Sequence, residues 1–431
     1  MFINFPEIND LLIQDRDVMI PKMVTIRQHF DACQIADIPL HIREQMEANA
    51  GAPERFKGKR IAITAGSRGI PNIVVILKTI CDILKEWGAR PFVVPAMGSH
   101  GGATAKGQEE VLASYGITES GIGAPIKSSM DVVRYGTLPN GIPLFCDKLA
   151  FESDGIVICH KIKPHTDFRN EHESGLCKMI AIGLGKHKGA AAIHSQGFCG
   201  FGSFITEAAR QFLQAAPVAF GVGIIQNAYD EIHTLEVIPG AQIMEADARL
   251  LKTAKQQLAG FKFDDIDVLI IDRIGKNISG YGFDPNVVGR SNSRCYGFED
   301  PVRIKRLFIR GLTPESHHNG SGINEADITT RRCLNDIDWS ETWTNLITAT
   351  EIQGSKIPMY VNNDREALVI ALRCCNGAPR PHRVARIKDT LSMKELQVSE
   401  ALYEAIKDQP DIEYVRGPEE ILFDGDGFMV D

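Results

Sequence analysis

The fold is decided by a stretch at residues 60–102, which reads RIAITAGSRGIPNIVVILKTICDILKEWGARPFVVPAMGSHGG. Its apolar runs predict strands over 60–64 and 91–95, with a helix over 72–86 between them and another over 105–115. A strand, a glycine loop, a helix and a second strand in this order are typical of a parallel α/β sheet. Ligands of such sheets bind beyond the carboxyl ends of the strands, so the glycine loops that follow these two strands are candidate binding loops.

The rest of the chain extends this pattern and predicts two domains. Further strands are expected at 23–27, 131–135, 143–146, 155–159, 219–226, 232–237 and 268–272, and further helices at 37–50, 203–215 and 241–258, the last as a connector. A chain of 431 residues is too long for one ordinary core. We therefore expect two α/β domains with largely parallel sheets and an interdomain active-site cleft. Residues 1–259 should carry the site and residues 260–399 should close the cleft, with a tail at 400–431 that is able to return to the first domain.

The composition is that of a soluble globular protein, with 44% hydrophobic residues, 24% charged residues and a formal net charge of −8. The acidic balance argues against a nucleic-acid partner. No apolar run approaches the length of a membrane span, and the start MFINFPEIND lacks the pattern of a secretion signal, so a cytoplasmic location is expected. The ten cysteines form no CxxC pair, so most are expected to be reduced and buried. The expected partner is therefore a small-molecule substrate. A homo-oligomer is compatible with the same features.

A second stretch gathers groups that can carry chemistry. Residues 160–194 read HKIKPHTDFRNEHESGLCKMIAIGLGKHKGAAAIH and hold five of the twelve histidines together with Lys178. Imidazoles and an amine that follow a strand are more typical of a reaction centre than of a solvated face. Apolar neighbours imply that Lys178 is partly buried, which favours the uncharged amine that a nucleophile or a covalent tether needs. A lysine that snorkels from an apolar helix is the commoner alternative.

The glycine loops offer polar groups to the same sheet edge. Arg68 lies between glycines after the first strand, where its planar guanidinium suits a substrate carboxylate, although an ordinary surface arginine fits the pattern equally well. The loop Ser99-His100-Gly101-Gly102 is a candidate backbone nest for a phosphate group, with a histidine inside it. We expect these residues to bind cofactor and substrate.

Two further segments resemble binding loops. The run 183–186, GLGK, is not a phosphate loop, because His187 stands where the motif GxxxxGK[ST] requires Ser or Thr. Lys276 and Asn277 follow the strand at 268–272, and Arg290 lies a little further on. These three residues are expected to bind the substrate from the second domain.

The order of the motifs resembles the lactate racemase family, the nickel-pincer-nucleotide-dependent 2-hydroxyacid racemases and epimerases. The similarity covers roughly residues 60–290. In that family a proline-histidine pair precedes a small-residue turn that ends in lysine, and another histidine follows sixteen residues later. Here Pro164-His165 precedes the turn SGLCK, which ends at Lys178, and His194 follows at the same spacing.

The resemblance implies a role for each matched residue. Lys178 would be the lysine joined through a thioamide to the cofactor, pyridinium-3,5-bisthiocarboxylic acid mononucleotide nickel, and His194 would be the protein ligand to Ni. His100 and His165 would be the paired acid/base histidines, and Arg68 would orient the substrate carboxylate. The implied activity is inversion at C2 of a 2-hydroxy acid by hydride transfer to the nickel-pincer nucleotide.

Some positions depart from the family pattern. The segment before Lys178 is longer than in lactate racemase and contains His172, which is therefore an alternative base to His165. The family's later substrate-binding residues are not matched after Asn277, and the polar groups there favour a larger hydroxy acid, such as a sugar acid or a dicarboxylate.

Two other functions fit parts of the pattern. A zinc-dependent hydrolase or lyase would use His100, His165 and His194 as ligands, but no HxH or HExxH spacing supports it. A non-catalytic nucleotide-phosphate binder would use the glycine loops alone.

Overall fold

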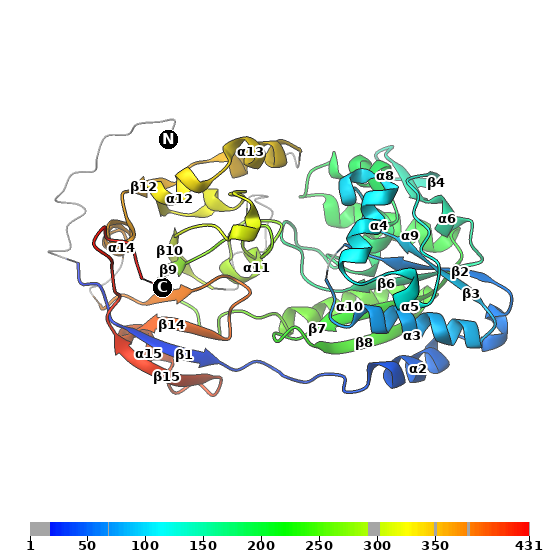
Figure 1. Cartoon of the computed structure of the whole chain (residues 1–431), viewed down its shortest axis with the longest axis horizontal. Helices are drawn as coiled ribbons and strands as arrows, with labels where there is room; N and C mark the ends of the chain where they lie inside the picture. Colours follow the sequence, from blue (N-terminus) through cyan, green and yellow to red (C-terminus); the bar gives the residue numbers. More distant parts are fainter. Residues whose placement is uncertain (1–17, 68, 292–301, 349–350, 377–379, 431) are drawn as a thin grey trace. The chain divides into compact units, whose positions relative to one another are not determined.

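The computed structural model describes residues 18–67, 69–291, 302–348, 351–376 and 380–430. The chain forms two compact units (Figure 1). Unit 1 comprises Met1–Phe30 together with Ala259–Asp431, and unit 2 comprises Asp31–Leu258. Each unit has its own sheet and its own hydrophobic core.

In its described residues, unit 2 is built on a five-stranded sheet. In spatial order the strands are β3 (Arg90–Pro95), β2 (Arg60–Ala65), β6 (Gly155–Lys161), β7 (Val218–Gln226) and β8 (Ile232–Pro239). The first four run parallel, and β8 pairs antiparallel with β7. All five predicted strands of this sheet are confirmed. A separate antiparallel pair is formed by β4 (Val132–Thr137) and β5 (Pro143–Asp147).

Helices cover both faces of this sheet (Figure 1). One face is covered by α2 (Ile38–Asn49), α3 (Ile73–Glu86) and α4 (Ala105–Ser114), and the other by α7 (Leu176–Lys178), η4 (Met179–Gly183), α8 (Lys186–His194), α9 (Phe201–Ala215) and α10 (Ile243–Gln256). Side chains of β2 alternate between the two cores, with Ile61 and Ile63 on the first face and Ala62 on the second. Because both faces are buried, the strands read as almost continuous apolar runs.

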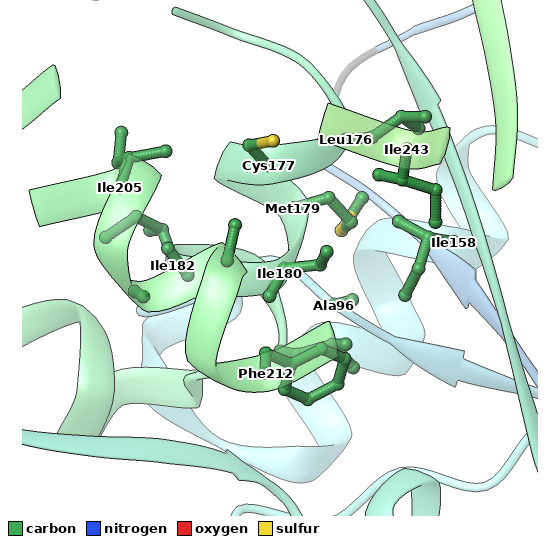
Figure 2. Close-up of a cluster of buried hydrophobic side chains, with 14 of the residues drawn as sticks. Ala96, Ile158, Leu176, Cys177, Met179, Ile180, Ile182, Ile205, Phe212 and Ile243 are labelled. Atoms are coloured by element: carbon green, nitrogen blue, oxygen red, sulfur yellow. The ribbon is translucent and has the colours of Figure 1, made fainter. Parts of the chain in front are cut away.

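The segment that carries Lys178 is anchored in the second of these cores. Figure 2 shows Leu176, Met179 and Ile180 packed beside Ile158 and Ile243. Each such apolar side chain stabilises the fold by about 1.5–3 kcal/mol when it is fully buried. The segment then widens into a π-helical turn, in which the N–H of residue 184 donates to the carbonyl of Met179 at 2.8 Å. Such turns are rare in proteins, and many of those that occur lie at functional sites.

Unit 1 is built on an eight-stranded sheet in the part that the structure describes. In spatial order the strands are β12 (Met359–Val361), β11 (Ile328–Thr330), β10 (Ile304–Ile309), β9 (Ile266–Ile271), β13 (Val384–Ile387), β14 (Glu395–Ser399), β1 (Met23–Gln28) and β15 (Ile412–Glu419). The first five run parallel, and β14, β1 and β15 are joined antiparallel. Its main helices are α11 (Pro285–Val288), α12 (Arg331–Asp336), α13 (Trp339–Thr348), α14 (Asp364–Arg373) and α15 (Glu400–Ile406).

The division of the chain differs from the predicted domains 1–259 and 260–399 at the N-terminal end. Strand β1 belongs to unit 1, because it pairs with β14 through Met23 and Ser399 and with β15 on its other side. The tail after residue 400 does return to an N-terminal segment, but to this strand and within unit 1. Backbone pairing over such sequence distances leaves no mark in local sequence patterns.

The predicted fold class, α/β with largely parallel sheets, is confirmed. The expected cleft between the domains stays a prediction. The helix expected as a connector, α10, instead packs in the core of unit 2 through Ile243, Leu250 and Leu251. Among the described residues, none of the helices combines the length and the apolar character that crossing a membrane requires.

Candidate active site

Three parallel strands of unit 2 end at one edge of the sheet, and the predicted loops follow them. Gly66 and Ser67 come directly after β2, the loop 97–102 follows β3, and β6 ends with His160 and Lys161. Arg68 lies outside the described residues, so its role as the substrate-orienting arginine stays a prediction. The carboxyl edge of a parallel sheet is where its ligands bind.

A pocket of about 100 Å³ opens at this edge of unit 2. Its lining includes Ser67, His100, His160, Ser174, Lys178 and Met179. The structure therefore brings together three segments that are far apart in sequence: the loop after β2, the loop after β3 and the lysine-bearing helix.

His165 is not part of the pocket lining, but it lies against Lys178, which is. The Nζ atom of Lys178 and the Nε2 atom of His165 are 2.5 Å apart. The backbone N–H of Asp167 approaches Nδ1 of His165 at 3.0 Å, so Nε2 is the ring nitrogen that faces the amine. The amine and this ring nitrogen are close enough to exchange a proton. A covalent tether needs the uncharged form of the amine.

The backbone of His165 is fixed by the buried carboxylate of Glu173. The His165 N–H donates to Glu173 Oε2 at 2.7 Å, and Arg169 donates both to His165 O at 2.7 Å and to Glu173 Oε2 at 3.2 Å. Lys255 of α10 pairs with the other oxygen of Glu173 at 2.6 Å. Sequence reasoning missed Glu173, because its role depends on a lysine 82 positions further along the chain.

His165 is held in its neutral form. Burial lowers its pKa well below the ordinary value of 6.5, and the nearby charges of Lys178 and Lys163 lower it further. A neutral imidazole at pH 7 can accept a proton, so the environment suits His165 as a general base.

His194 stands at the end of α8, outside the pocket lining, and packs against two phenylalanine rings. Its ring centroid lies 4.8 Å from that of Phe201 and 5.9 Å from that of Phe198, and Phe198 is in turn 6.2 Å from His165. Although the residue as a whole is exposed, desolvation of the ring, with the charges of Lys178 and His100, lowers the pKa of His194 to about 4. At neutral pH His194 therefore offers a nitrogen lone pair, which a metal ligand requires.

The conformation of the loop after β3 is explained by its packing against α4. His100 lines the pocket, whereas Ser99, Gly101 and Gly102 are not part of its lining. Gly101 has φ +65°, and a Cβ atom there would come within 2.5 Å of the backbone of Gly107 in α4. The glycine is thus required by a close backbone contact, and phosphate binding by this loop stays a prediction.

His160 is a pocket residue that the sequence did not single out for a role. It lies at the end of β6 and lines the pocket. A Cβ atom at Gly66 would lie 3.1 Å from its ring and 3.2 Å from Cε of Met179, so the glycine after β2 makes room for this imidazole. Its position at the carboxyl end of a parallel strand was the signal that could have identified it.

The alternative base, His172, is turned away from the pocket. It is buried, and its Nδ1 lies 3.0 Å from Asp247 Oδ2, while Asp247 Oδ1 accepts the N–H of Leu176 at 2.6 Å. Together with Cys177, these side chains place ligand atoms within 4.8 Å of one another, close enough to hold a metal ion. Hydrogen bonds already account for both Asp247 oxygens, and burial raises the pKa of the Cys177 thiol well above its usual value. These three side chains therefore stabilise the helix that carries Lys178.

The three residues predicted to bind substrate from the second domain belong to unit 1 and have local partners there. Lys276 donates to Gly280 O at 2.8 Å, and Asn277 Oδ1 accepts from Thr313 at 2.6 Å. Arg290 pairs with Asp327 at 2.8 Å. Their contact with substrate stays a prediction.

Comparisons with known proteins bear on the fold. No protein-family model matches this sequence, and no curated protein matches it either. One solved structure with a similar fold is the lactate racemase apoprotein from Thermoanaerobacterium thermosaccharolyticum, with a TM-score of 0.53 and 16% sequence identity. The similarity covers 86% of this chain and 99% of that chain. At this identity the likeness concerns the fold, and it agrees with the expected α/β architecture.

Proposed function

We propose that this chain is a racemase or epimerase that inverts C2 of a 2-hydroxy acid with a nickel-pincer nucleotide as its cofactor. The observation that carries the proposal is the contact between Lys178 and the neutral imidazole of His165 at a pocket that His100 also lines. The motif order and the likeness in fold to a lactate racemase apoprotein support the same class of reaction.

The residues present fit this cofactor. Lys178 would hold it covalently, since its amine is in contact with an uncharged base at the pocket. His194 would ligate nickel, because its lowered pKa leaves a free lone pair and imidazole is a good donor to Ni(II). When bound, the cofactor would supply the acceptor for hydride from C2.

The protein itself would move the hydroxyl proton. Loss of hydride from C2 leaves a carbonyl only if the proton of the hydroxyl group also departs. His165 is neutral and can take that proton. His100 would serve when the hydroxyl group points the other way, which inversion at C2 requires. We assign the base role to His165 and not to His172, whose ring is buried against Asp247.

The charge around the base favours an anionic substrate. Besides burial, the charges of Lys178 and Lys163 lower the pKa of His165, so positive charge adjoins its ring, while Arg169 is paired with Glu173. A substrate carboxylate would offset that charge, and a second anionic or polar group would offset more of it. This supports a larger polar hydroxy acid, such as a sugar acid or a dicarboxylate.

The alternatives receive no comparable support. The zinc hypothesis needs His100, His165 and His194 around one ion, whereas the group able to hold a metal among the described residues is that of His172, Cys177 and Asp247. The phosphate-binder hypothesis does not explain why a neutral imidazole, that of His165, contacts a lysine.

The test is an epimerisation assay on protein produced together with the enzymes that make the cofactor. Enantiopure 2-hydroxy acids are incubated with the holoprotein in deuterated water, and the epimers and their isotope content are followed by NMR. We expect epimer formation with hydrogen retained at C2, because hydride returns to the carbon from which it left. Extensive deuterium at C2, or no epimer from any acid of the panel, would contradict the proposal.

A further inference from the structure

Lys186 is a buried cation that the proposed chemistry does not use. Its side chain has no exposed surface, and its backbone adopts φ +54°, a left-handed conformation that is unfavourable for a non-glycine residue. It is the lysine of the run 183–186 that imitates a phosphate loop. A buried charge on a strained backbone persists only where the surrounding structure fixes it, and such residues gather at functional sites.

Three acceptors from three different segments surround the ammonium group. Lys186 Nζ donates to Pro95 O at the end of β3 at 2.5 Å and to Gln108 Oε1 in α4 at 3.0 Å, and it lies 3.0 Å from Asp147 Oδ2 at the end of β5. The ammonium group therefore makes two hydrogen bonds and one buried ion pair. Asp147 is also fully buried, and its other oxygen accepts the N–H of Ala150 at 2.9 Å.

Lys186 determines which way the amide of Gln108 faces. A lysine only donates, so the oxygen of Gln108 must be turned toward it and the NH₂ group must be turned away. That NH₂ group donates to Gly98 O at 2.9 Å and to His100 O at 3.3 Å. The amide of Gln108 thus links the buried lysine to two backbone carbonyls of the loop that presents His100.

Lys186 also begins the helix that ends with His194. The lysine is therefore connected to one histidine through α8 and to the other through Gln108. His100 contributes to the lowered pKa of His194, so the two imidazoles interact electrostatically. Their spacing is set by segments that meet at this ammonium group.

We propose that Lys186, with Asp147 as its counter-ion and Gln108 as its link, is the positioning residue that fixes His100 relative to His194. This rests on the proposed function for the roles of the two histidines, but the positioning itself is a property of the protein alone. A purely structural contact would be served as well by apolar side chains of similar volume, which often match or exceed a buried ion pair in stability. Apolar side chains could not supply the directional hydrogen bonds to β3 and α4.

The experiment separates the link from the ion pair. In Q108E the new carboxylate still accepts from Lys186 but donates nothing to the carbonyls of Gly98 and His100. K188M is the matched control, because Lys188 lies in the same helix and is exposed. K186M alone leaves Asp147 without its counter-charge and is expected to fold poorly, so the double variant K186M/D147N removes both charges together.

The first readout is hydrogen exchange of the peptide 96–104, measured by mass spectrometry on the full chain. In Q108E and in K186M/D147N we expect exchange in this peptide to become about tenfold faster or more, as one lost buried hydrogen bond predicts, with the strands β2 and β6 unchanged. K188M should match the wild type. Unchanged exchange in the peptide, or a uniform increase across unit 2, would overturn the positioning role.

The second readout is the holoprotein's epimerisation rate. We expect Q108E to lower kcat by about tenfold or more while KM stays within about twofold, since binding groups are intact and only the geometry of His100 is loosened. If the wild-type holoprotein forms no epimer, the proposed function fails while the exchange result still decides the positioning role. If the wild type is active and Q108E has the same kcat, the positioning role is wrong.

Discussion

The side chains at the carboxyl ends of the parallel strands differ in charge between the two sheets. In unit 1, Arg310 follows β10 and meets Asp272, which follows β9, at 2.6 Å, and it meets Asp364 of α14 at 3.0 Å. Arg386 of β13 pairs with the same Asp272 at 2.9 Å. In unit 2, the corresponding edge gathers Lys178 and histidines about a pocket.

The difference shows which edge is built for a ligand. The charge of the buried Arg310 in unit 1 is neutralised by carboxylates of the same unit. Arg310 also holds the C-terminal tail, because it donates to Met429 O at 2.7 Å. In unit 2, the charges that shift the pKa of His165 are positive. A cluster of like charges costs stability and remains useful where an anionic ligand completes it.

Replacing the lysine at the pocket should give the largest effect. We expect K178M to abolish the covalent adduct and to lower epimerisation about ten-thousand-fold or more, because the cofactor loses its tether. The free energy of unfolding should stay the same or rise, because a cation leaves a positively charged cluster. Intact-mass spectrometry, the epimerisation assay and urea unfolding measure these effects, with the exposed K188M as control. A K178M protein that keeps its adduct would break the comparison.

The matching change at the other edge should act on stability. R310M leaves Asp272 and Asp364 without their shared partner, and removing one member of a buried ion pair costs about 3–5 kcal/mol. The control is R303M, because Arg303 has a side chain that is 74% exposed and should contribute about 0.5 kcal/mol or less. Urea unfolding measures both. Similar losses for R310M and K178M would mean that the two edges do not differ as described.

Two histidines sharpen the comparison within unit 2. H165Q should lower kcat about 10²–10⁴-fold with little loss of stability, because it removes the proposed general base beside Lys178. H172Q should mainly lower stability, because His172 is buried against Asp247. Steady-state kinetics and thermal unfolding of the two variants, compared side by side, distinguish these roles. A larger fall in kcat for H172Q than for H165Q would move the base to position 172.

The smallest effect expected is on pH dependence. The pKa of His194 falls from 6.5 to about 4 on folding, and that of His165 also falls, so the unfolded chain binds more protons between these pH values. The free energy of unfolding of the apoprotein should therefore be highest above about pH 6.5 and should decline as the pH falls toward about 4. H194Q should flatten this decline in a series of urea titrations. An equal decline in H194Q would show that His194 does not titrate in this way.

Local patterns were sufficient for the five strands of the unit 2 sheet, whereas in the unit 1 sheet they predicted only the strands at 23–27 and 268–272. The strands at 60–64, 91–95 and 155–159 were identified because runs of apolar residues between glycine loops have few other interpretations. The place of β1 in the sheet of unit 1 was not predictable, because its pairing with Ser399 is a long-range hydrogen-bonding choice. The same holds for α10, whose inward face carries Asp247 and whose role in the core is set by its neighbours.

The sequence by itself determined the fold class and the residue types of the candidate site: Lys178, the histidines that flank it and the loop that carries His100. Only the tertiary structure decided that His165 and not His172 meets the lysine, and that His160 enters the pocket. It also revealed the supports, Glu173 beneath His165 and Lys186 with Gln108 behind His100. The physical reason is that periodicity and spacing encode which backbone forms, whereas hydrogen bonds between distant segments decide where each side chain points.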